Sequence, residues 1–209
     1  MPSDVHSAAP ALVDLTLKLE ESTALDGAVR AATPLAHAIV ANPTVRDVLQ
    51  GRPLGHALHP VLTDLPIGAW LSATVLDLTA GPAARPAASR LLGLGILAAV
   101  PTAISGWSEW AEADRPSQRV GVVHAAANVL ALSLYAGSWF ARRGGRHGTG
   151  VAMSLAATTV AGAGAYLGGH LAVARKLGTR DPAYADGSSG HTPTGAEQAD
   201  PPMEGGAGI

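Results

Sequence analysis

The sequence predicts an all-α fold: a four-helix antiparallel transmembrane bundle with short N-terminal amphipathic helices and a disordered C-terminal tail. The chain of 209 residues is 47% hydrophobic and only 14% charged, with a mean hydropathy of +0.22. Four stretches stay apolar over about 20 residues, the length that crosses roughly 30 Å of hydrocarbon. The connections between them are short, and short connections make consecutive helices antiparallel neighbours. We therefore expect one membrane domain with polar extensions.

The four predicted spans are Pro60 to Ala80, Ala88 to Ser108, Val120 to Phe140 and Val151 to Ala174. Each is apolar throughout, whereas a helix on the surface of a soluble protein shows a polar stripe. Turn-forming glycine and proline residues separate the spans. In the last span Gly164 and Gly168 form a G-x-x-x-G step, which indicates close helix packing. The predicted membrane domain covers residues 56–178.

Polar segments flank this domain on both sides. In residues 1–55, spaced leucines predict an amphipathic helix from Leu12 to Ala32 that Thr33 and Pro34 end. Shorter helical pieces follow at Leu35 to Val40 and Pro43 to Gln50. They are too polar to span a bilayer, so we expect a surface segment on the membrane, a cap on the bundle or a solvated linker. Residues 179–209 are rich in Gly, Ser, Thr, Pro and acid, which predicts disorder.

Cysteine is absent from the chain. This excludes disulfides, a Cys-ligated iron–sulfur cluster within this chain, covalent c-type haem attachment and a thiol nucleophile. The net charge of -2 argues against a nucleic-acid partner. The expected partner is the lipid bilayer.

The expected location is the cell inner (plasma) membrane, crossed several times. No apolar run before Pro60 is long enough for a cleavable signal peptide, so we expect the first span to act as its own insertion signal. The positive-inside rule weakly favours cytoplasmic termini. The basic residues on the side of the termini are Arg46, Arg52, Arg115, Arg119, Arg175, Lys176 and Arg180, against Arg85, Arg90, Arg142, Arg143 and Arg146 on the other.

Four histidines stand near the ends of predicted spans, and antiparallel connectivity places all four ends on one face of the bilayer. They are His56, His59, His124 and His170. Ionisable side chains are costly at membrane depth, so a convergent set is by default a functional-site hypothesis.

The first hypothesis is a haem b site. His124 lies five residues inside Arg119, and His170 lies five residues inside Arg175. At 1.5 Å per residue, both imidazoles are about 7 to 8 Å past their flanking charges. The matched depth predicts that His124 and His170 are axial ligands, with Arg119 and Arg175 meeting the haem propionates.

The second hypothesis is a divalent metal ion held by His59, Asp64, His124 and His170, a set of nitrogen and carboxylate ligands that zinc or non-haem iron accepts. The third is that nothing binds and the histidines hydrogen-bond across the bundle, each bond being worth about 0.6 kcal/mol. Asp64 has its own alternative role, because Pro66 interrupts the helix ladder and frees backbone groups that a carboxyl can meet.

A resemblance accompanies these residues. The run from Gly51 to Trp70 contains H-x-x-H-P-x-L-x-D-x-P-I-G and resembles the bacterial family of predicted membrane proteins known as domain of unknown function 2231. Further similarities are Ser105-Gly106-Trp107, His124 with Asn128, and Tyr166 to His170. The resemblance implies a four-helix membrane protein but no agreed activity. Some members carry a Rieske-type domain or lie beside redox partners, which implies electron transfer with, for this chain, a separate iron–sulfur or other redox protein.

Taken together, the sequence predicts an integral membrane protein that binds haem b or a metal and serves as an electron-transfer or redox-partner subunit. The alternative is a non-enzymatic membrane scaffold or small permease whose polar histidine cluster lines a proton or solute path. No reaction is predicted, so the question of an enzymatic activity stays open.

Overall fold

The computed structural model describes residues 10–178, and this part of the chain is helical without strands. The predicted all-α bundle is confirmed. Its long helices are α4 (Leu58–Thr79), α5 (Arg85–Trp110), α6 (Arg115–Arg143) and α7 (His147–Gly169). A π-helical turn, His170–Ala174, extends α7. The predicted tail, 179–209, lies outside the described residues.

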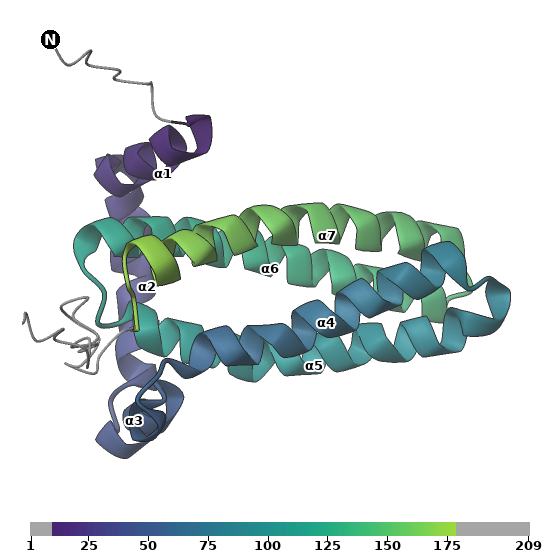
Figure 1. The fold of residues 1–209 in the computed structure, drawn as a ribbon, viewed down its shortest axis with the longest axis horizontal. Helices are drawn as coiled ribbons and strands as arrows, with labels where there is room; N and C mark the ends of the chain where they lie inside the picture. The colour runs from purple at the N-terminus through teal and green to yellow at the C-terminus, as the bar shows by residue number, and fades with distance from the viewer. Residues whose placement is uncertain (1–9, 179–209) are drawn as a thin grey trace, which may run out of the picture.

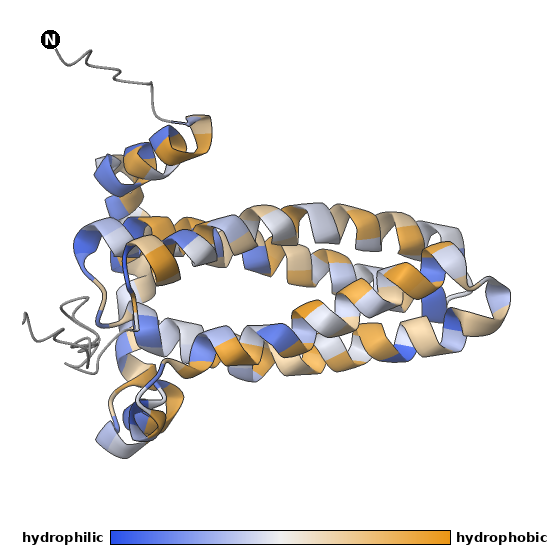
Figure 2. Cartoon of the chain, in the orientation of Figure 1, coloured by the Kyte–Doolittle hydropathy of each residue, from blue (hydrophilic) through white to orange (hydrophobic). Residues whose placement is uncertain are grey.

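All four helices are long and apolar enough to cross a membrane. They run up and down as predicted, so both ends of the described chain lie at one end of the bundle (Figure 1). Hydrophobic residues line the bundle, and hydrophilic ones gather mostly at its ends and on the N-terminal helices (Figure 2). We call the end that carries the N-terminal helices the histidine end.

Three short helices precede the bundle: α1 (Ala11–Glu21), α2 (Asp26–Ile39) and α3 (Pro43–Leu49). Helix α2 crosses the histidine end of the bundle (Figure 1). Its buried residues Val29 and Ala36 pack with Trp110 and Val122 of the bundle. The N-terminal segment therefore caps the bundle.

The N-terminal helices break at a different place from the one predicted. The chain turns at Ser22, and α2 then continues through Pro34. The turn places the Asp26 carboxylate and the Glu20 backbone oxygen beside the Arg119 guanidinium. Arg119 donates to the carboxylate at 2.8 and 3.0 Å and to the backbone oxygen at 2.9 Å. A tertiary ion pair, which the local pattern does not reveal, thus sets the break.

The bundle consists of two hairpins, α4–α5 and α6–α7, that repeat one another. Three pairs of facing side chains join α4 to α6, and the members of each are 65 positions apart: 59 and 124, 70 and 135, and 77 and 142. In the middle pair Trp70 stacks on Tyr135, with ring centroids 4.1 Å apart. The parallel helices α4 and α6 therefore face each other in a constant register.

Burial follows the same repeat. In α4 and α6 the buried pairs are Pro66 with Ala131, Trp70 with Tyr135, and Ala73 with Ser138. In α5 and α7, where equivalent residues are 62 positions apart, they are Ala88 with Gly150, Leu92 with Ser154, Thr102 with Gly164, and Ser105 with Leu167. Equivalent positions thus face the bundle interior in both hairpins.

Pro66 leaves one carbonyl of α4 without its usual helical donor, that of Leu62. The Thr102 hydroxyl of α5 lies 3.1 Å from this oxygen and 2.9 Å from the backbone oxygen of Ala98, so its one proton is shared between the two carbonyls. The polar group that meets the freed carbonyl therefore comes from across the hairpin rather than from Asp64.

Candidate functional site

His59 of α4 and His124 of α6 face each other at the histidine end of the bundle. Their ring centroids are 6.4 Å apart, and the rings are nearly perpendicular, at 85°. Both residues are partly buried. Because they occupy equivalent positions of the two hairpins, each hairpin contributes one imidazole to the pair.

The two imidazoles are held in the same way. Nδ1 of His59 lies 2.9 Å from the backbone oxygen of Thr102, and Nδ1 of His124 lies 2.8 Å from that of Gly164. A carbonyl oxygen can only accept, so in both rings Nδ1–H donates and, in the neutral imidazole, Nε2 carries the lone pair. This arrangement is common for metal-binding histidines, whose other ring nitrogen is fixed by a backbone carbonyl or a carboxylate.

A glycine faces each ring from the other helix of its hairpin. A Cβ atom at Gly106 would lie 2.8 Å from Cε1 of His59, and one at Gly168 would lie 2.9 Å from Cε1 of His124. Any side chain there would displace the imidazole. The predicted packing role of Gly164 and Gly168 agrees with this, because a Cβ at Gly164 would contact Ala127 and Asn128 of α6.

The Nε2 atoms of His59 and His124 differ in their hydrogen bonding. The Asn128 amide nitrogen lies 3.0 Å from Nε2 of His124 and also 3.0 Å from the backbone oxygen of that histidine. Nε2 of His59 makes no hydrogen bond within residues 10–178. The Nε2 lone pair of His124 is therefore already engaged by the Asn128 amide, whereas that of His59 is not engaged by any of residues 10–178.

The other predicted haem ligand, His170, points elsewhere. Its Nε2 lies 2.7 Å from Oε1 of Glu20 in α1. His170 comes two residues after Gly168, and at 3.6 residues per turn this is about 200° around the helix from the face that meets His124. The structure thus brings His124 together with His59 rather than with His170. Sequence reasoning missed Glu20, since no local pattern marks it as a histidine partner.

The two predicted propionate partners are engaged in protein contacts. Arg119 binds Asp26 and the Glu20 backbone, as described above. Arg175 donates to Asp114 at 2.7 Å and to the Ser117 hydroxyl at 3.3 Å. Burial raises the pKa of Asp114, but hydrogen bonds from Ser117 and the nearby Arg175 guanidinium outweigh it and lower this pKa below its ordinary value.

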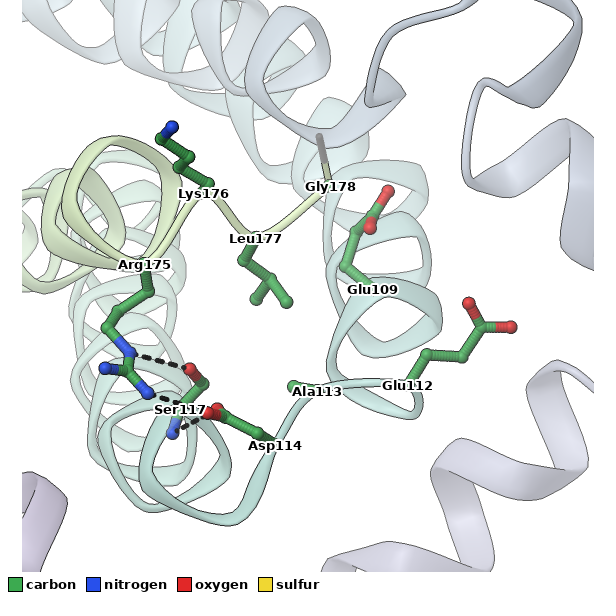
Figure 3. A pocket seen from close by; sticks show the side chains of 9 residues that line it. All are labelled: Glu109, Glu112, Ala113, Asp114, Ser117, Arg175, Lys176, Leu177 and Gly178. Carbon is green, nitrogen blue, oxygen red and sulfur yellow. Dashed lines mark hydrogen bonds and ion pairs between the residues drawn. The ribbon is translucent and has the colours of Figure 1, made fainter. Parts of the chain in front are cut away.

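Asp114, Ser117 and Arg175 line a cavity of about 290 Å³ at the histidine end. Figure 3 shows the residues around it. Arg175 and Asp114 lie on one side of it and Glu109 on the other. None of the four clustered histidines lines it. The cavity and the facing histidines are therefore separate features.

Asp64 and His56 stand apart from the pair. Asp64 is exposed on the outer side of α4, and it has no hydrogen bond or ion pair within the described residues. His56 is exposed in the loop before α4. Within residues 10–178, no group of three or more His, Asp or Glu side chains is arranged to hold a metal ion.

The opposite end of the bundle carries a buried ion pair that sequence reasoning did not predict. Arg142 donates to both carboxylate oxygens of Asp77, at 2.6 and 2.7 Å, and both side chains are 2% exposed. Arg142 also donates to the hydroxyls of Ser138 and Ser154. The sequence spacing could have suggested this pair. Asp77 follows His59 by 18 positions, and Arg142 follows His124 by the same number.

Comparison with known proteins identifies a family but no activity. No curated protein and no solved structure matches the chain. Residues 55–181 match the model of a family described as "Predicted membrane protein (DUF2231)". The matched part includes all four long helices and the facing histidines. The chain therefore belongs to the DUF2231 family of predicted membrane proteins.

Proposed function

We propose that this membrane protein binds haem b between His59 and His124 and serves as an electron-transfer or redox-partner subunit. The observation that supports it is the pair of facing imidazoles, each with Nδ1–H fixed by a backbone carbonyl, so that Nε2 is the lone-pair atom of each ring. Binding at His124 displaces the Asn128 amide from this atom. Such fixed tautomers are typical of metal-ligating histidines.

The spacing of the rings agrees with one metal ion held between them. A metal ion bound by both Nε2 atoms would need metal–imidazole bonds of about 2.0–2.1 Å, the value for zinc. Two such bonds and the radius of each ring would together account for the 6.4 Å between the ring centroids. Perpendicular rings do not interfere with such an arrangement.

The number of ligands favours haem over a bare ion. Protein zinc sites use three or four protein ligands, whereas haem iron takes four nitrogens from its own macrocycle and needs only axial ligands from the protein. Two histidines, with no group of three or more such side chains arranged for a metal among residues 10–178, agree with the second case. A divalent ion that completes its coordination with water is the alternative occupant.

The position of the pair suggests how electrons would be exchanged. His59 lies in the first turn of α4, close to the membrane surface at the histidine end. Haem bound there would be within reach of a separate iron–sulfur or other redox protein. The distribution of basic residues weakly favours a cytoplasmic position for this end. The membrane that we propose is the inner (plasma) membrane.

The experiment is spectroscopic. Wild-type protein is purified in detergent, supplemented with haem and examined for a Soret band, and metals are measured by elemental analysis. We expect His59→Ala and His124→Ala each to abolish the band. His170→Ala and Asp64→Val serve as matched controls and keep it, because these side chains lie away from the pair.

Two outcomes contradict the proposal. Loss of the band in His124→Ala and His170→Ala, but not in His59→Ala, would favour the pair predicted from sequence depth. A wild-type protein that stays colourless and metal-free would favour the scaffold or permease, with the histidines as structural residues.

A further inference from the structure

Helix α1 has an apolar face that the bundle covers only in part. Leu12, Leu15 and Leu19 follow one another at the spacing of one helix face. Leu19 is partly buried, whereas Leu12 is 54% and Leu15 is 47% exposed. The opposite side of the helix carries Asp14 and Glu21 together with Leu17, which is 45% exposed. Exposed leucines next to a packed one indicate that the covering surface continues beyond the protein.

Ion pairs fix the depth of α1 relative to the spans. Glu20 lies 2.7 Å from His170 at the end of α7 and 3.6 Å from Arg175, and its backbone oxygen accepts from Arg119 near the start of α6. These partners stand where two membrane helices leave the apolar part of the bundle. Helix α1 is therefore held at the level of the membrane surface.

The apolar face continues onto the membrane-spanning helices. Leu19 packs with Val120, Leu167 and Leu171, which belong to α6 and to α7 with its π-helical turn. Val120 and Leu167 lie on the bundle side of Arg119 and His170 along their helices, and Leu171 lies just beyond His170. This face of α1 therefore meets the spans where their charged ends give way to apolar residues. In Figure 1, α1 extends sideways beyond the bundle.

We propose that Leu12 and Leu15 insert among lipid acyl chains, so that α1 anchors the N-terminal cap on the bilayer surface. Amphipathic helices commonly bind in this position, with the apolar face at the boundary between headgroups and chains. The charges of α1 are Asp14, Lys18, Glu20 and Glu21, which do not form a basic patch for anionic headgroups. The binding is therefore apolar, and it does not depend on the proposed haem.

The test uses the absence of native cysteine. Full-length protein with Leu15→Cys carries a nitroxide label and is reconstituted in phosphatidylcholine vesicles. Electron paramagnetic resonance then compares collisions with oxygen, which concentrates in lipid, and with a water-soluble nickel chelate. Asp14→Cys is the matched control on the polar side of α1, and Val75→Cys on the exposed face of α4 marks a lipid-facing site.

We expect the oxygen-to-nickel ratio at Leu15 to resemble that at Val75 and to exceed that at Asp14 severalfold. A ratio equal to that at Asp14 would place the face in water and overturn the proposal. Low collision rates with both reagents would overturn it too, because they would mean that protein, not lipid, covers Leu15. The labelled Val75→Cys protein, reconstituted in the same way, reports whether the bundle is inserted in the vesicles.

Discussion

The two ends of the bundle are built from the same register of α4 against α6 but finish differently. At one end Asp77 and Arg142 bind each other through two hydrogen bonds, and serine hydroxyls satisfy more of the guanidinium. At the other end His59 and His124 face each other without a hydrogen bond between them; both are anchored to backbone carbonyls. At the first end, which we call the closed end, the two charged groups satisfy each other. At the second end Nε2 of His59 has no hydrogen bond within residues 10–178, and Nε2 of His124 meets only the Asn128 amide. A candidate site is therefore recognised by the polar atoms that its own contacts leave weakly satisfied.

The largest effect is expected at the closed end. Arg142→Ala or Asp77→Ala leaves a buried charge without its partner, which costs about 3–5 kcal/mol. We expect a large fall in the midpoint of thermal unfolding in detergent. His59→Ala without added cofactor should cost only about 0.6 kcal/mol, the mean for a hydrogen bond between membrane helices.

The control for this prediction is the double variant of Asp77→Ala with Arg142→Ala. It removes both charges, so its destabilisation should be smaller than the sum of the two single effects. Additive effects, or single variants that melt like wild type, would mean that the ion pair does not close this end.

A smaller effect is expected from the glycines that face the histidines. Gly106→Leu and Gly168→Leu force a side chain into an occupied position, and such overpacking costs about 1–3 kcal/mol. Gly162→Leu is the matched control in α7, because a Cβ there meets nothing within 4 Å. Thermal melts in detergent should separate the first two variants from the third. Equal melting of all three would mean that the histidines are not packed against these helices.

The smallest effect concerns the cap on the histidine end. The hydrogen bond from Arg119 lowers the pKa of Asp26 below its ordinary value of 3.8. A lowered pKa in the folded state means that the ion pair contributes fully above pH 3.8 and is lost only as the pH falls below that value, through the lowered pKa of the folded state. A nitroxide on α1 should therefore keep its mobility down to pH 3.8 and become more mobile at lower pH.

Asp26→Asn is the control for this acid effect. It removes the titrating group, so the label should already be more mobile at neutral pH, and its mobility should respond less to acid than in the wild type. A label whose mobility changes identically with pH in both proteins would exclude Asp26 as the titrating group.

Hydropathy and connectivity predicted the four spans and the end at which the histidines meet. They did not predict that His124 faces His59 while His170 faces Glu20. The rotation of a membrane helix is hard to infer from sequence, since its lipid-facing and core-facing sides are both apolar. The exposed Leu97 and the buried Leu92 of α5 illustrate this, because nothing in their chemistry separates them.

The repeat of the α4–α5 hairpin in the α6–α7 hairpin was also not recognisable from the sequence. Equivalent positions seldom carry the same residue: Trp70 corresponds to Tyr135, and Thr102 corresponds to Gly164. Only the contacts reveal the correspondence, together with the histidine and the facing glycine that both hairpins share. Because packing depends on side-chain volume and polarity, two hairpins can share one backbone geometry although most of their equivalent residues differ.

The repeat has a consequence for symmetry. A single hairpin with one histidine and one facing glycine would form the same imidazole pair by associating with an identical hairpin. In such a symmetric assembly, equivalent positions carry the same residue, so an acid would face an acid. Asp77 opposite Arg142 requires two halves of different sequence. Having both hairpins in one chain therefore allows identical groups to meet at one end of the bundle and opposite charges to meet at the other.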